Sequence, residues 1–167
     1  AVYEGGEIVD QLVEIFDFDL EPQDSFRHDD FNNGLVVDVE VGPLGDVFVG
    51  VDTGDPGGEG EILWFTYEGD FIDVIPLPDD PVQGDHAWYY PWGFDVLADG
   101  RLLVAQPNSQ QIILLDVDGT VERTDGVDSR PEDVAGRTDP AFGFVFADGA
   151  DHETFVNFSL GSQSYWV

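Results

Sequence analysis

Short apolar segments separated by glycine-containing turns follow one another through the middle of the chain. Between Pro91 and Val121 there are three such segments, with Asp-Gly turns that end at Gly100 and Gly119. Asp-Gly pairs between apolar strands predict tight hairpins. This stretch is therefore predicted to form antiparallel strands joined in a meander.

The same pattern recurs in two other places. In residues 39–71, Gly45 takes the place of Gly100 in the first hairpin, and a third copy starts at Phe142. Periods of about 50 residues that each contain four short strands are typical of propeller blades. The predicted fold class is all-β, a β-propeller of four-stranded antiparallel blades.

The repeat assigns strands along the whole chain. They are expected at residues 35–41, 47–52, 62–67, 71–77, 92–97, 102–106, 112–117, 120–123, 140–146, 154–158 and 165–167. Residues 8–15 are expected to form an outermost strand, followed by an acidic connection over 16–33. No window shows a 3.6-residue apolar period, so little helix is expected. The central strands are apolar on both faces, as strands between neighbouring blades should be.

Turn spacing predicts how many blades the chain holds. If Gly5 is matched with Gly69 and Gly119, the intervals are 64 and 50 residues. About three blade-lengths are then present, half of a six-bladed ring, because complete propellers usually have four to eight blades. The expected division of this single domain is a blade end at 1–30, blades at 31–80 and 86–127, and a partial blade at 138–167. The chain is then a segment of a longer protein, or a protomer that closes its ring with a second copy or another protein partner.

The net charge of the chain indicates the environment in which the protein works. The chain has 36 acidic and five basic residues, a formal net charge of −31, and every basic residue is an arginine. Molar salt shortens the Debye length to about 3 Å and screens such repulsion. The composition therefore predicts a protein from an extreme halophile. The alternative, a disordered acidic chain, disagrees with 42% hydrophobic and 13% aromatic residues.

Some partners are excluded by the same composition. Nucleic-acid binding needs clustered basic residues, which the chain lacks. No apolar run approaches the roughly 20 residues that span a bilayer, so no membrane span is expected. The expected location is extracellular, cell-surface or particle-associated, with the cytoplasm left open.

The second blade carries a family resemblance. It combines a Pro-Xaa-Gly start at Pro91, a turn and strand of the form DG-R-L-L-V-A, an N-S-x-x-I segment and a D-x-D-G turn. This unit resembles the NHL repeat and is similar to blades of the SMP-30/gluconolactonase-like propellers. In the lactonase-like family, acidic and Asn residues around the central channel bind metal, one of them in a Pro-Asn-Gly version of this start. Here the start is Pro91-Trp92-Gly93, and tryptophan cannot coordinate a divalent cation.

An aromatic segment is the leading candidate for ligand binding. In a four-stranded meander, the loop between the second and third strands emerges on the same face as the connection between blades. Residues 26–34, 52–61, 85–93, 106–111 and 130–137 are placed on that face. Polar-edged aromatics there suit a protein or glycan ligand, and the candidates are His86, Trp88, Tyr89, Tyr90 and Trp92. The alternative is that some of these rings only fill space between blades.

An acidic, glycine-rich loop is the candidate metal site. Asp52, Asp55 and Glu59 offer hard oxygen ligands on a pliable loop, which suits Ca²⁺. The alternative is plain acidic surface, since acidic residues are abundant. Residues 28–30, His-Asp-Asp, form a second candidate, with a solvated loop as the alternative.

Arginines cluster late in the chain. Arg130 and Arg137 can bind an anionic ligand at the loop face, or pair with neighbouring acids together with Arg123.

Two classes of function follow. The first is a non-catalytic binding or structural module. The second is a metal-dependent lactonase-like hydrolase that uses a cation and an acid–base residue such as His86 or Asp95.

Overall fold

The structure is a computed structural model that describes residues 2–4, 7–52, 60–78, 93–106, 110–126, 135–139, 143–146, 156–158 and 165–166. Within these ranges nearly every element is a β-strand, and the one helix is the five-residue α1 (Asp29–Asn33). The expectation of an all-β chain with little helix is confirmed. No helix in this part of the chain has the length and apolar character needed to cross a membrane.

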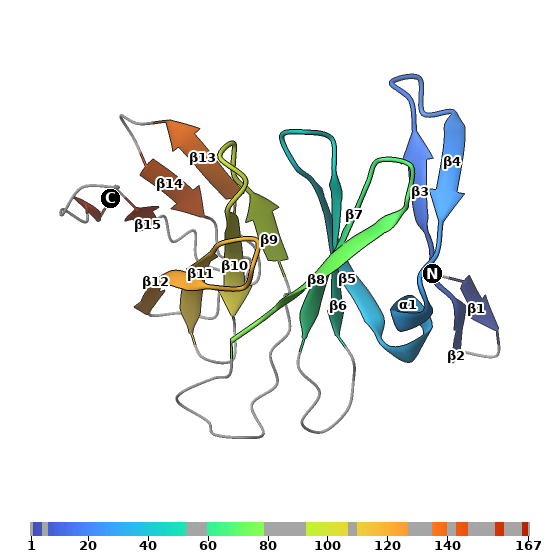
Figure 1. Ribbon diagram of the computed structural model, residues 1–167, viewed down its shortest axis with the longest axis horizontal. Coiled ribbons are helices and arrows are strands. Elements are labelled where there is room, and N and C mark those ends of the chain that lie inside the picture. The colour runs from blue at the N-terminus through green and yellow to red at the C-terminus, as the bar shows by residue number, and fades with distance from the viewer. Residues whose placement is uncertain are drawn as a thin grey trace.

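Three four-stranded antiparallel sheets form the body of the fold, and consecutive strands pair within each (Figure 1). We call the three sheets blades A, B and C. Blade A contains β5 (Leu35–Val41), β6 (Val47–Asp52), β7 (Glu61–Phe65) and β8 (Phe71–Pro76). Blade B contains β9 (Gly93–Val96), β10 (Leu102–Gln106), β11 (Gln111–Leu115) and β12 (Val121–Gly126). Blade C contains β13 (Ala135–Asp139), β14 (Gly143–Phe146), β15 (Val156–Phe158) and β16 (Tyr165–Trp166).

Blade C contains a strand that the sequence pattern did not predict. β13 precedes β14, whereas the third copy was expected to begin with a strand over 140–146. Arg137, predicted on a loop segment, therefore lies in a strand. The sequence of β13, AGRTD, shows no apolar alternation, so its strand conformation depends on pairing with β14, where Ala135 lies opposite Val145.

The N-terminal part also differs from its predicted arrangement. The single strand expected over 8–15 is divided into β2 (Glu7–Asp10) and β3 (Val13–Phe16), and β1 (Val2–Glu4) pairs with β2. The expected acidic connection over 16–33 contains β4 (Pro22–Phe26), which pairs with β3, and then α1.

The interruption between β2 and β3 lies at a buried amide. The side-chain nitrogen of Gln11 donates to the carbonyls of Phe31 and Gly34, the second at 2.7 Å. Its side-chain oxygen accepts from the Val36 N–H at 2.9 Å. These bonds satisfy the buried amide, so Gln11 ties the end of α1 and the start of β5 to the N-terminal strands.

Most hairpins in the described residues share one turn geometry. In the turn between β11 and β12, the Asp116 N–H donates to the Thr120 carbonyl at 2.9 Å, and the Gly119 N–H donates to the Asp116 carbonyl at 2.9 Å. The same two bonds close the turns over 42–46, 66–70 and 97–101. The fourth residue of every one of these turns is a glycine with φ between 81° and 91°. Glycine adopts this region without steric cost.

The hairpin of β3 and β4 has the same turn with leucine in place of glycine. The Asp17 N–H donates to the Glu21 carbonyl at 3.1 Å and the Leu20 N–H to the Asp17 carbonyl at 3.0 Å. Leu20 has φ 61°. It lies 49 residues before Gly69, close to the 50 residues between Gly69 and Gly119. This interval is more regular than the one counted from Gly5, which lies outside the described residues, and it gives β3 and β4 the spacing of the third and fourth strands of blade A.

The two middle strands of blade A, β6 and β7, are buried on both faces. Alternate residues such as Val49 and Phe65 pack with Val13 and Phe26 of the β3–β4 hairpin and with Phe31 of α1. The intervening residues, Phe48 and Ile62 among them, form a second core with blade B. Successive side chains of a strand point to opposite faces, so one apolar run serves two interfaces.

The first strands of blades A and B, β5 and β9, are also joined by a hydrogen bond. The Phe94 N–H donates to the Asp38 carboxylate at 2.9 Å, from β9 to β5. This bond and the shared core hold the two blades together.

Candidate functional site

Most of the predicted ligand-binding residues lie outside the described ranges. These are His86, Trp88, Tyr89, Tyr90, Trp92 and Arg130. Arg137 is placed only by its backbone, in β13.

The predicted calcium site is described at one residue. Asp52 ends β6, whereas Asp55 and Glu59 lie outside the described residues. Among the side chains that the structure describes, no group of three His, Cys, Asp or Glu residues could hold a metal ion.

The structure instead brings together a mixed acidic and aromatic group between β4, α1 and blade A. We call it the His28 corner; it consists of His28, Asp30, Glu61, Phe65 and Phe71. His28 precedes α1 as its N-cap, and its Nδ1 lies 3.4 Å from the Asp30 N–H nitrogen and 3.1 Å from an Asp30 carboxylate oxygen. Neutral imidazole can accept the backbone hydrogen bond, and protonated imidazole can donate to the carboxylate.

Aromatic rings fix the orientation of the imidazole. The His28 ring stacks on Phe71, with centroids 4.9 Å apart and planes at 26°. It also meets Phe65 edge to face at 5.6 Å and 73°. Phe65 is fully buried, whereas Phe71 is 46% exposed. The imidazole thus has one side on the core and another beside a partly exposed ring.

Glu61 supplies a carboxyl whose protonation is shifted. Partial burial raises its pKa above the ordinary value of 4.5, and the nearby charge of Asp30 adds to this effect. His28 acts in the opposite direction. A carboxyl in these surroundings holds a proton more readily than an exposed one, so it can donate as well as accept hydrogen bonds.

The sequence placed two of these segments on one face without identifying the group. Residues 26–34 and 52–61 were predicted to share the loop face, and the charges of Asp30 and His28 act on the pKa of Glu61, whereas residues 53–59 lie outside the described ranges. Phe71 was missed because it reads as an ordinary strand residue. Its role depends on stacking against His28, and the spacing of residues in the sequence does not reveal that contact.

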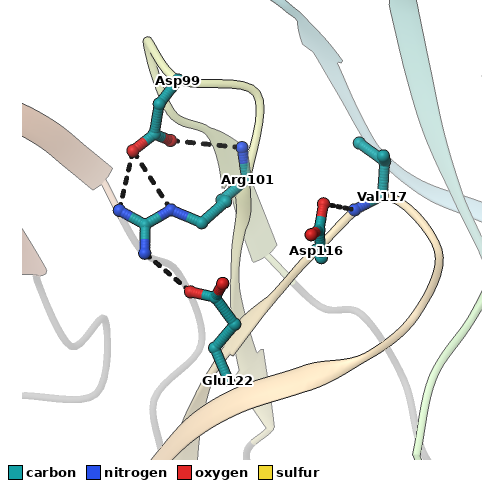
Figure 2. A network of polar contacts seen from close by, with 5 residues as sticks. All are labelled: Asp99, Arg101, Asp116, Val117 and Glu122. Atoms are coloured by element: carbon teal, nitrogen blue, oxygen red, sulfur yellow. Dashed lines mark hydrogen bonds and ion pairs between the residues drawn. The ribbon is translucent and has the colours of Figure 1, made fainter.

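A second polar group lies on the tight turns of blade B (Figure 2). We call it the Arg101 clamp; it consists of Asp99, Arg101 and Glu122. The Arg101 guanidinium donates to Asp99 at 2.7 and 3.1 Å and to Glu122 at 2.7 Å. These hydrogen bonds hold the pKa of the Asp99 carboxyl below its usual value of 3.8. The clamp joins the β9–β10 turn to β12, and both acids in it are partners of the same cation.

Comparison with known proteins places the fold in context. No protein-family model and no curated protein matches the chain. A solved structure of a protein of unknown function from Bacteroides caccae superimposes with a TM-score of 0.64 at 15% identity, over 90% of this chain and 51% of that one. Virginiamycin B lyase from Staphylococcus aureus superimposes with a TM-score of 0.58 at 13% identity, over 93% of this chain and 48% of that one. A catalytically inactive variant of that lyase with quinupristin gives a TM-score of 0.57 at 12% identity, over 90% and 46%.

These likenesses concern the fold. Virginiamycin B lyase has a β-propeller-like fold, which agrees with the antiparallel four-stranded sheets seen here. The chain spans about half the length of the solved structures it matches. At such low identity, no activity or ligand passes from them to this chain.

Proposed function

We propose that this chain is a non-catalytic binding module with an NHL-like propeller fold, which works at high salt in an extracellular or particle-bound assembly. One observation carries the proposal. In the His28 corner, a half-exposed Phe71 ring stacks on His28 beside the carboxyls of Asp30 and Glu61. Elsewhere among the described residues, polar side chains such as Gln11 and Arg101 hold strands and turns in place.

The corner is chemically suited to a protein or glycan ligand. An aromatic ring offers an apolar contact surface at low entropic cost, and carboxyls accept hydrogen bonds from hydroxyl or amide groups. The predicted aromatic segment His86, Trp88, Tyr89, Tyr90 and Trp92 would extend this surface along the loop face. Arg130 and Arg137 would favour an acidic part of the same ligand. In this proposal the ring is completed by a second copy or by another protein.

A binding screen in molar KCl tests the proposal. Labelled protein is applied to a glycan array and to a displayed peptide library, and hits are measured by calorimetry. Phe71→Ala should weaken binding of a hit by about 1 to 3 kcal/mol, the range for truncating an aromatic contact. Phe18→Ala is the matched control, because Phe18 is a fully exposed phenylalanine on the β3–β4 turn. Equal losses in the two variants would contradict the assignment of the corner.

A hydrolase of the lactonase type is the second candidate. The raised pKa of Glu61 favours it, because a carboxyl that retains its proton can act as a general acid. In this alternative, Ca²⁺ bound by Asp52, Asp55 and Glu59 would polarise the substrate. Lactone hydrolysis in molar KCl with added Ca²⁺ tests it. Turnover that Glu61→Gln abolishes would favour the hydrolase over the binding module, and absence of turnover in the parent chain would count against it.

A further inference from the structure

Two valines of β5, the first strand of blade A, are exposed beside a buried core. Val39 is 39% exposed and Val41 is 61% exposed. In the β5–β6 register they lie opposite Val49 and Val47, which belong to the core shared with the β3–β4 hairpin. Residues directly opposite in an antiparallel pair share a face. The exposed valines therefore continue an established interface toward the inside of the propeller.

The equivalent positions in blade B are covered. Counted from the matched turn glycines, Phe94 corresponds to Val39 and Val96 to Val41. Phe94 is 0% exposed, and both residues pack in the core between blades A and B. The difference lies in the neighbouring element. Blade B packs on a complete four-stranded sheet, whereas blade A packs on the two-stranded hairpin of β3 and β4 and on the short helix α1.

The hairpin of β3 and β4 is the outer half of a blade. Its turn residue Leu20 lies 49 residues before Gly69, which is in the turn between the third and fourth strands of blade A, although the turn geometry itself also occurs in the first hairpin of each blade. Among the described strands, β3 pairs with β4 and with no other. The side of β3 away from β4 is where the second strand of a complete blade would pair. An inner pair of strands at that position would also lie over Val39 and Val41.

The chain contains a pair of strands, β1 and β2, that could fill this position but does not pair with β3. β1 and β2 form a separate two-stranded sheet and precede β3, the same order as the strands of each blade. Tyr3 lies opposite Ile8 in their register. Two residues, Gln11 and Leu12, separate β2 from β3. A reversal over two residues needs positive φ at one or both, which favours glycine or asparagine. Gln11 is also held by its hydrogen bonds to Phe31 of α1 and Val36 of β5.

We propose that the β1–β2 hairpin of a second copy of this chain fills the inner half of this blade, and that the exchange is reciprocal. The hairpin of each copy pairs with the free edge of β3 in the other and covers Val39 and Val41. A connection that is too constrained for folding back within one chain favours exchange of the segment between two chains. The formal charge of −31 on each copy opposes association, so the dimer forms only at screening salt concentrations. This inference concerns assembly and does not rest on the proposed binding function.

Cross-linking between cysteine variants tests the exchange. The natural chain has no cysteine, so every thiol is an introduced one. Chains with Ile8→Cys and chains with Val39→Cys are unfolded together, refolded as a mixture in molar KCl and treated with a short bismaleimide. We expect a covalent heterodimer. Val121→Cys replaces Val39→Cys in the control, because Val121 is an equally exposed valine on β12, and the heterodimer should be lost.

Light scattering in molar KCl gives an independent result. We expect a dimer for the parent chain, a monomer with unchanged β-type circular dichroism for Val39→Glu, and a folded monomer for a chain that lacks residues 1–10. A monomeric parent chain would overturn the proposal. So would a dimer that survives both changes, or a cross-link that forms only within a single chain carrying both cysteines.

Discussion

The Arg101 clamp and the His28 corner use similar side chains for different ends. In the clamp, one guanidinium binds two carboxylates, and the pKa of Asp99 is lowered. In the corner, partial burial and the charge of Asp30 raise the pKa of Glu61, and the opposing effect of His28 is smaller. A carboxylate whose charge is balanced by a guanidinium, as in the clamp, holds a hairpin together. An uncompensated group beside a half-exposed aromatic ring retains the capacity to bind something else.

The largest effect that we predict is unfolding of the whole chain at low salt, which would disrupt the clamp and the corner together. Lowering KCl below roughly 0.5 M should abolish the β-type circular dichroism, because 31 uncompensated negative charges then repel one another with little screening. Circular dichroism across a KCl series measures it, with neutral sucrose as the control for a general solute effect. Full structure in dilute buffer would contradict the halophilic interpretation.

The next largest effect is the loss of stability when the buried ring of the corner, Phe65, is removed. Phe65→Ala should lower the free energy of unfolding by about 3 to 5 kcal/mol, because the ring is fully buried against Phe26, Phe31 and His28. Urea unfolding in molar KCl measures the loss. Phe18→Ala should change stability by less than about 0.5 kcal/mol, since that ring is in solvent. Similar losses in both variants would show that Phe65 does not anchor the corner.

The clamp should contribute less and should depend on acidic pH. Arg101→Gln should cost about 1 kcal/mol or less at neutral pH, because its carboxylate partners are partly exposed. The lowered pKa of Asp99 contributes stability above pH 3.8, which is lost as the pH falls through the folded value. Urea unfolding of parent and variant between pH 7 and the acid limit of the fold measures the difference. The two curves should converge on acidification; a constant gap would mean that Asp99 is not the partner that matters.

The smallest predicted effect is the contribution of Glu61 to stability, whose pH dependence is opposite to that of Asp99. The raised pKa of Glu61 means that the native state holds this proton more tightly than the unfolded chain does. Its contribution to stability is full below pH 4.5 and is lost as the pH rises through the folded value. Glu61→Gln should therefore raise stability at neutral pH by about 0.5 kcal/mol and flatten this dependence. The same urea series tests it, with Glu68→Gln on the exposed β7–β8 turn as the control. A variant less stable than the parent at neutral pH would indicate that the Glu61 carboxylate has a cationic partner.

The strands of blades A and B could be predicted from sequence because local signals coincide there. The bounds of β5, β6 and β10 agree with prediction, and β7, β8, β9 and β11 differ from it by no more than two residues at either end. In these blades, apolar runs are flanked by turn glycines at fixed spacing. The elements that were missed lack one of these signals: β13 has no apolar alternation, and the β3–β4 turn has Leu20 where the repeat has glycine.

The sequence by itself determined the meander, because apolar segments and turn glycines are local properties that act wherever the chain lies. It also determined that blade A has apolar residues on both faces. Only the tertiary structure decided which of these faces is covered. Val39 and Phe94 occupy the same position of the repeat, yet one is exposed and the other is buried, because burial depends on the neighbouring element. The same holds for the His28 corner, where Phe71 stacks on His28 and Glu61 is influenced by Asp30, each partner more than 30 positions away. Contacts of this kind form when strands distant in sequence pack, and no local pattern records them.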